Sequence, residues 1–218
     1  MNDQGVVQVG GQSQQGLPGG IYPVVMPPAV PPPQYLRPLR QPLYDMEIMP
    51  TSGTPSELAF FQRPVSQSTA YGSVTKTAAE TNLQQAAQLP TPNQFSLFGF
   101  LVQCNAGVSL ANFVALYETC VFEFTFTGSR LYLQIPLAQI PQGLGPTGFI
   151  YGTTGTVVTN GVPHVKNLYQ FNLGKYALMI RSNETFGTKM RWPNGAPTIS
   201  TSNVRIHHYL VGIYYTAI

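Results

Sequence analysis

Residues that could perform acid–base or metal chemistry are few in this 218-residue chain, and they are widely separated. Beyond Asp45 there is no aspartate, and Glu118 and Glu123 are the only pair of glutamates close together in the sequence. A glycosidase requires two carboxylates that flank one bond, and a Mg²⁺ or Ca²⁺ site usually requires several oxygen ligands. The carboxylates therefore give no indication of a hydrolase or of a site for either cation.

The histidines and cysteines do not follow a metal-binding pattern. His207 and His208 are adjacent in an expected strand, so their side chains point to opposite faces and cannot both bind one metal. Cys104 and Cys120 form no C-x-x-C motif, and the sequence leaves open whether they pair. The N-terminal MNDQGVV lacks the basic and apolar regions of a secretory signal, so we expect buried, reduced thiols.

Motifs for a nucleophilic serine or a phosphate-binding glycine loop are missing from the sequence. We therefore expect a protein that is not an enzyme, with no catalytic residues, no cofactor and no bound metal. No apolar run approaches the roughly 20 residues that span a bilayer, so we also expect no membrane span.

One stretch combines positive charge with aromatic rings, a pairing that can hold phosphates and stack bases. Its cations are Lys175, Arg181, Lys189 and Arg191. The net charge of +3 is mild, so we favour a polar strand face followed by a loop over a nucleic-acid site. Arg191 and Trp192 form a candidate ligand loop for a sugar or a neighbouring subunit; the alternative is a Trp192 packed on the end of the domain.

The N-terminal arm, residues 1–45, carries a different signal. Residues 27–44 read PPAVPPPQYLRPLRQPLY, and proline fits neither a helix interior nor a central strand, so an extended polyproline conformation is predicted. The arm has as many aspartates as arginines, which disfavours nucleic acid as its partner. We expect it to lie along neighbouring subunits. The expected contact residues are Tyr22, Val24, Val25, Tyr35, Leu36, Arg37, Leu39, Arg40, Leu43 and Tyr44.

Strands are predicted from alternation. In residues 121–135, VFEFTFTGSRLYLQI, apolar and polar side chains alternate on both sides of Gly128-Ser129, which predicts a β-hairpin with one buried face. Other short runs rich in β-branched and aromatic residues are separated by Gly, Pro and Asn clusters. The further strands expected are 95–103, 148–152, 157–159, 168–173, 176–181 and 204–215.

Helical spacing is limited to short segments. Ser109 is placed to cap the sequence SLANFVALYE, and the Ala and Gln content of residues 75–88 suggests a second short helix. The pattern as a whole predicts an all-β, jelly-roll-like antiparallel β-sandwich with one short helix in a loop. We divide the chain into the N-terminal arm, a transition segment at 46–94 that packs on the body, and a β-sandwich domain at 95–218.

The order of these features resembles the single jelly-roll capsid and minor capsid proteins of bacteriophages and other icosahedral viruses. The resemblance covers about residues 60–218. It rests on FFQRPVSQ at 60–67, TNLQQAAQLPTPNQF at 81–95, FEFTFTGSRLYLQIPLAQIP at 122–141 and NVRIHHYLVGIYY at 203–215. It implies a virion component, assembled in the host cytoplasm, whose partners are its own copies and other virion proteins. The neutral arm departs from the basic, genome-binding arms of many capsid proteins.

The expected function is therefore that of a capsid-shell, vertex or cement subunit. Charged residues make up only 9% of the chain, against about 25% in typical soluble domains, which fits a surface that faces other protein. One alternative is a receptor- or glycan-binding spike or fibre module that uses the Trp192 loop. Another is an adaptor, because Pro32-Pro33-Gln34-Tyr35 matches the P-P-x-Y pattern of ligands for WW domains, and proline-rich arms also bind SH3 domains.

Overall fold

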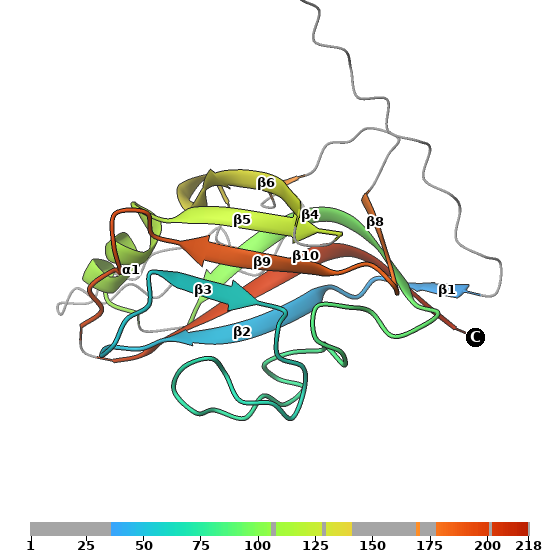
Figure 1. The fold of residues 1–218 in the computed structure, drawn as a ribbon, viewed down its shortest axis with the longest axis horizontal. Helices are drawn as coiled ribbons and strands as arrows, with labels where there is room; N and C mark the ends of the chain where they lie inside the picture. Colours follow the sequence, from blue (N-terminus) through green and yellow to red (C-terminus); the bar gives the residue numbers. More distant parts are fainter. Residues whose placement is uncertain are drawn as a thin grey trace, which may run out of the picture.

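The computed structural model describes residues 36–105, 108–127, 130–140, 169–170, 178–200 and 202–217. In these parts the chain forms two antiparallel sheets packed face to face (Figure 1). The larger sheet contains β1 (Leu36–Leu39), β2 (Leu43–Met49), β4 (Gln94–Cys104), β7 (Tyr169–Gln170), β8 (Leu178–Arg181) and β10 (Val204–Ala217). The smaller sheet contains β3 (Glu57–Phe60), β5 (Val121–Phe126), β6 (Arg130–Pro136) and β9 (Phe186–Arg191).

The strand order is that of a jelly roll. In the larger sheet, β2 and β1 share one edge of the long strand β10, β4 lies on its other edge, and β8 and β7 pair with the far edge of β4. The smaller sheet has the order β3-β9-β5-β6. The chain therefore alternates between the sheets from β2 to β5, and again from β8 to β10. This confirms the predicted jelly-roll-like β-sandwich.

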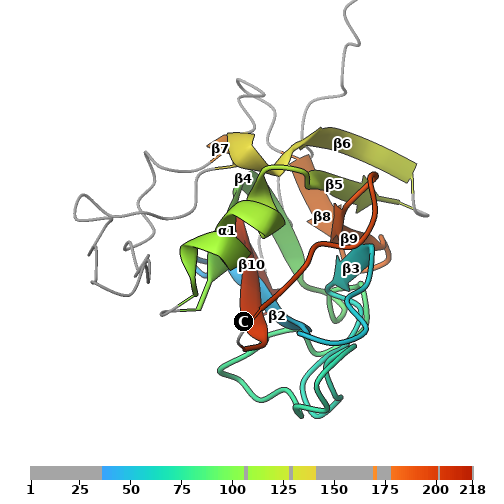
Figure 2. The ribbon, with the colours of Figure 1, turned by 90° about the vertical axis from the view of Figure 1, so that its left-hand side faces the viewer.

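The core lies between the two sheets and consists of the inward residues of alternating strands. Phe100 of β4 meets both Phe122 and Phe124 of β5, with ring centroids 5.1 Å apart in each case. From β10, Ile206 and Leu210 are completely buried on the same side. Figure 2 shows the two sheets as layers, with α1 (Leu110–Tyr117) across one end.

The predicted hairpin is confirmed, since β5 and β6 pair along their lengths, although the turn at Gly128-Ser129 lies outside the described residues. Its buried face is less complete than the alternation suggested. Leu131 is 49% exposed, and the pairing shifts register after Phe124. Because β6 is the last strand of its sheet among the described residues, its apolar side chains have fewer partners across the sandwich.

Four of the other predicted strands correspond to observed ones. Those at 95–103 and 204–215 are β4 and β10, and those at 168–173 and 176–181 contain β7 and β8. The predicted strands at 148–152 and 157–159 lie outside the described residues. The prediction did not include β1, β2, β3 or β9 as strands.

The helix predictions have opposite outcomes. Ser109 caps α1, because its side chain accepts a hydrogen bond from the backbone N–H of Asn112 at 3.2 Å. The helix suggested at 75–88 is wrong: this segment consists of turns with isolated bridges, and its polar groups bond to β2 instead of to a helical ladder. Among the described residues, no helix is long and apolar enough to cross a membrane.

The body begins earlier in the chain than the sequence suggested. Strand β1 starts at Leu36, within the N-terminal arm, while β2 and β3 place parts of the arm and of the 46–94 segment in the two sheets. Pro38 is accommodated because β1 pairs only with β10, and an edge strand tolerates a residue without an N–H. Residues 1–35 lie outside the described part of the chain.

Candidate functional site

The residues expected to contact neighbouring subunits fall into two sets. Tyr22, Val24, Val25 and Tyr35 lie outside the described residues. The remaining six lie in or between the first two strands: Leu36, Arg37 and Leu39 in β1, Arg40 after it, and Leu43 and Tyr44 in β2. Leu36 and Leu43 are buried in the chain's own body, whereas Arg37 and Arg40 are exposed. The two arginines are therefore the exposed members of this second set.

The candidate ligand loop is anchored to the body. Trp192 is only 2% exposed, and its indole Nε1–H donates to the backbone oxygen of Leu116 at 3.1 Å. Arg191 donates from Nε to Glu123 Oε1 at 2.8 Å, and its Nη2 lies 2.6 Å from the same oxygen. The indole thus fixes the end of α1 to the sandwich, and its faces are covered by protein.

The basic stretch is matched by carboxylates wherever it is described. Lys189 pairs with Glu57 at 2.7 Å, and Arg181 lies 3.9 Å from Glu184. The pairs of Lys189 with Glu57 and of Arg191 with Glu123 form a polar outer face on the smaller sheet, whereas Arg181 ends β8 in the larger sheet. Lys175 lies outside the described residues.

The two thiols are buried and free. Burial raises the pKa of Cys104 and that of Cys120 to about 12, which keeps both protonated at neutral pH. A protonated thiol is a poor nucleophile and a poor metal ligand. No group of three or more His, Cys, Asp or Glu suited to a metal ion occurs within the described ranges.

The adjacent histidines lie in different surroundings, as their strand position predicted. His208 stacks on Phe60 at 3.5 Å, and its Nδ1 lies 2.7 Å from Thr188 Oγ1. Burial, with a smaller contribution from His207, holds the pKa of His208 well below its usual value. His207 stacks on Tyr209 instead, and burial lowers its pKa as well. His208 is therefore a neutral histidine of the core.

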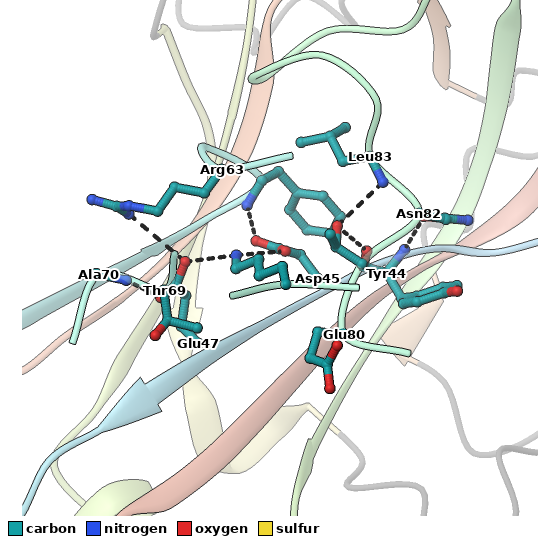
Figure 3. A network of polar contacts seen from close by, with 12 residues as sticks. Tyr44, Asp45, Glu47, Arg63, Thr69, Ala70, Glu80, Asn82 and Leu83 are labelled. Atoms are coloured by element: carbon teal, nitrogen blue, oxygen red, sulfur yellow. Dashed lines mark hydrogen bonds and ion pairs between the residues drawn. The ribbon is translucent and has the colours of Figure 1, made fainter. Parts of the chain in front are cut away.

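Among the described residues, the most deeply buried charges belong to a group that the sequence analysis did not connect: Asp45, Glu47 and Lys76, here called the buried ion cluster. Their side chains are all 0% exposed. Lys76 Nζ lies 2.7 Å from Asp45 Oδ1 and 2.7 Å from Glu47 Oε1 (Figure 3). One lysine thus bridges two carboxylates out of contact with water.

The jelly-roll topology explains this location. Asp45 and Glu47 are two residues apart in β2, so both side chains point to one face. Their partners across the sheet in β10 are the buried His208 and Ile206, which places the carboxylates on the interior side. The neighbouring edges of β2 and β3 are covered by residues 61–93, the covering segment, which lies below β2 in Figure 1 and delivers Lys76.

The other carboxylate oxygens are satisfied by the covering segment. The backbone N–H of Phe61 donates to Asp45 Oδ2 at 2.6 Å, and that of Ala70 donates to Glu47 Oε2 at 2.7 Å. Arg63 Nη1 lies 3.7 Å from Glu47 Oε1, and its side chain is 37% exposed. Burial has the largest influence on Asp45 and raises its pKa from 3.8 to about 6, although Lys76 and the Phe61 N–H act in the opposite direction.

A second set of bonds ties the covering segment to the start of β2. The Tyr44 hydroxyl donates to the carbonyl of Ala78 at 2.5 Å, and the Tyr44 N–H donates to Asn82 Oδ1 at 3.0 Å. The Asn82 side chain donates in turn to the carbonyl of Pro42 at 2.8 Å. The covering segment is therefore fixed to β2 on both sides of Lys76 in the structure.

The signal for this cluster was present in LYDMEIM at 43–49, where apolar and acidic residues alternate with period two. Reading this heptapeptide as a strand would have placed both carboxylates on one face. Its partner Lys76 follows a long loop, and no local pattern in the sequence links the two.

Comparison with known proteins gave no match: no family model, curated protein or solved structure matches this chain. The fold class is therefore assigned from the strand order alone, and it is a jelly-roll β-sandwich. The first described strand, β1, lies at an edge of the larger sheet.

Proposed function

We propose that this protein is a virion structural protein: a capsid-shell, vertex or cement subunit that assembles through its β-sandwich body and lays its N-terminal arm on neighbouring subunits. The observation that carries the proposal is the jelly-roll order of the two sheets, preceded by a proline-rich segment. Jelly rolls recur in viral capsids, but also in lectins and cupins. A fold does not imply a function, so features of the surface must support the choice.

The first supporting feature is the low content of charged residues, 9% of the chain, several of which are paired in the described part of the structure. Glu57, Glu123 and Glu184 are each joined to a cation of the basic stretch, and the two carboxylates of β2 are buried. Soluble monomers normally rely on interspersed surface charge. Large apolar side chains are exposed on several elements: Val65, Phe98, Val114, Leu131 and Tyr132. Such a surface favours contacts with other protein.

The second supporting feature is the place where the arm joins the body. Leu36 pairs with Ala217, so the arm enters the sheet beside the end of the last strand (Figure 1). The exposed Arg37 and Arg40 flank this junction. Guanidinium groups bind carboxylates and carbonyls through several donors, which suits them to the surface of a neighbouring subunit. The arm and these arginines therefore act together as one contact region.

The proposal is tested by deleting residues 1–35, so that the truncated chain begins at the first residue of β1. The truncated chain should keep the fold, because all described strands remain, and should fail to form closed particles. Circular dichroism and thermal unfolding report the fold, and electron microscopy with light scattering reports assembly. The double variant Arg37→Ala/Arg40→Ala is a milder form of the same test. Particles of normal size and yield from the truncated chain would overturn the role of the arm.

No described contact favours either alternative function. A glycan-binding module would need an exposed ring in the Trp192 loop, and the indole is buried. The adaptor hypothesis depends on Tyr35, which lies outside the described residues. Loss of binding to WW domains on Tyr35→Ala would favour the adaptor over the virion component.

A further inference from the structure

The buried ion cluster brings together the groups that a condensation between an amine and a carboxylic acid requires. The nucleophile is Lys76 Nζ, and Asp45 Cγ lies one bond beyond the oxygen that Nζ contacts at 2.7 Å. A second carboxylate, that of Glu47, contacts the same nitrogen at 2.7 Å. Fixing reactants in contact can contribute effective concentrations of about 10⁵–10⁸ M.

The surroundings assign different roles to the two carboxyl groups. Asp45 is the electrophile, because burial raises its pKa to about 6 and a protonated carboxyl group is attacked far more readily than an ionised one. Glu47 is the second carboxylate, and Arg63 Nη1 lies 3.7 Å from its Oε1. An ionised carboxylate within hydrogen-bond reach of the attacking nitrogen is suited to act as a general base.

The remaining oxygen of Asp45 is already held by a donor. Phe61 N–H donates to Oδ2 at 2.6 Å, so it would stabilise the negative charge that this oxygen gains during attack. All three side chains are closed to solvent, and the ionised cluster holds two carboxylates against one ammonium. Buried charges are costly unless fully compensated. Condensation removes one charge of each sign from the interior and leaves only Glu47 beside Arg63.

We propose that Lys76 and Asp45 condense in the folded protein to an amide bond that links the covering segment to β2. A proton passes from the Lys76 ammonium to Asp45, which gives a neutral amine and a neutral acid. Nζ attacks Cγ, Glu47 accepts a proton from the nitrogen, and Oδ2 carries the negative charge. Glu47 then returns the proton to Oδ1, which leaves as water. The products are one amide and one water, and no oxidant or other reactant is consumed.

This bond would close a covalent loop between residues 45 and 76. It would fix the covering segment to β2 through a link that does not depend on pH or salt. The inference stands apart from the proposed function, since it rests only on the geometry of one chain.

The test is the intact mass of the full-length chain, purified in folded form and measured under denaturing conditions. The expected mass is that of the sequence minus one water. Digestion with trypsin should leave the chain uncut after Lys76, and because trypsin does not cut between Arg63 and Pro64, Asp45 and Lys76 should stay in one looped peptide, residues 41–130, whose mass is that of its sequence minus one water. Lys189 is a matched control, because it contacts Glu57 at the same 2.7 Å but is 32% exposed. Trypsin should cut after Lys189, with no link to Glu57.

Three variants separate the roles. Lys76→Arg keeps the positive charge without a competent nucleophile, and Asp45→Ala removes the electrophile; both should show the full mass expected of their sequences. Glu47→Gln keeps the shape of the side chain and should leave most chains unlinked while the fold persists by circular dichroism.

The full sequence mass in the wild-type protein would overturn the proposal, and so would a loss of water that persists in Lys76→Arg, because that would indicate cyclisation at another site. Undiminished linkage in Glu47→Gln would overturn the role of Glu47 as base.

Discussion

Two ion pairs with the same separation lie in opposite environments of this molecule. Lys76 contacts Asp45 at 2.7 Å where neither side chain is exposed, and Lys189 contacts Glu57 at 2.7 Å where the side chains are 32% and 45% exposed. On the surface, water already solvates both charges, so the pair contributes about 0–1 kcal/mol. In the interior each charge depends on its partner. The comparison shows that burial, and not distance, decides what a charge contributes to the fold.

Removing the buried cation should have the largest effect on stability. Lys76→Met removes the buried cation, or the proposed amide in its place, and leaves Asp45 and Glu47 buried with only the partly exposed Arg63 nearby; breaking a buried pair in this way costs about 3–5 kcal/mol. Unfolding by urea, monitored by fluorescence of the single tryptophan, measures the change. The matched variant Lys189→Met should change the free energy of unfolding by about 0–1 kcal/mol. Equal effects of the two variants would contradict the comparison.

Trp192 extends the comparison to aromatic side chains. Trp192→Phe removes the donor to Leu116 and leaves a buried carbonyl without its partner, which should cost about 1–3 kcal/mol. Phe98→Leu, at a site that is 42% exposed, should stay within about 0.5 kcal/mol in the monomeric state. Thermal unfolding distinguishes the two. If Trp192→Phe leaves the unfolding temperature unchanged, the indole does not stabilise the packing, and a role in ligand binding is favoured.

The smallest expected effect is a difference in pH dependence between the two histidines. The pKa of His208 is lowered well below 6.5, so below pH 6.5 the unfolded chain binds more protons at this residue than the folded chain does. The stability that neutral His208 contributes is therefore present above pH 6.5 and is lost as pH falls toward the folded-state value. His208→Gln should flatten the curve of unfolding free energy between pH 7 and 5 more than His207→Gln does. A larger flattening by His207→Gln than by His208→Gln would show that burial in the core is not what lowers the pKa of His208.

Local patterns predicted the parts of the fold that depend on local chemistry. The alternation around Phe122 and Phe124 indicates a strand with one buried face, whichever strands pair with it. The Ser109 cap depends on residues within one helical turn. β9, by contrast, reads FGTKMR, with Gly187 and Thr188 buried by the strands on both sides. No local rule marks such a sequence as central in a sheet, because neighbouring strands determine its burial.

The contact of Lys76 with Asp45 and Glu47 was beyond prediction for a related reason. Prolines in the preceding segment suggested that Leu43 and Asp45 belonged to an extended arm, yet β1 and β2 pair with the two halves of one long strand. Asp45 and Glu47 then face Lys76 only because the covering segment crosses the sandwich edge. The alternation in residues 43–49 marks the two carboxylates, but the position of Lys76 beside them follows from the topology and leaves no trace in the sequence.

The most direct test of the account is the native mass and symmetry of the purified full-length chain, measured by native mass spectrometry and electron microscopy under assembly conditions. The account predicts closed particles with icosahedral symmetry, or incorporation of the subunit into such a shell when its partner proteins are supplied. A chain that stays monomeric at all concentrations, with and without those partners, would contradict it.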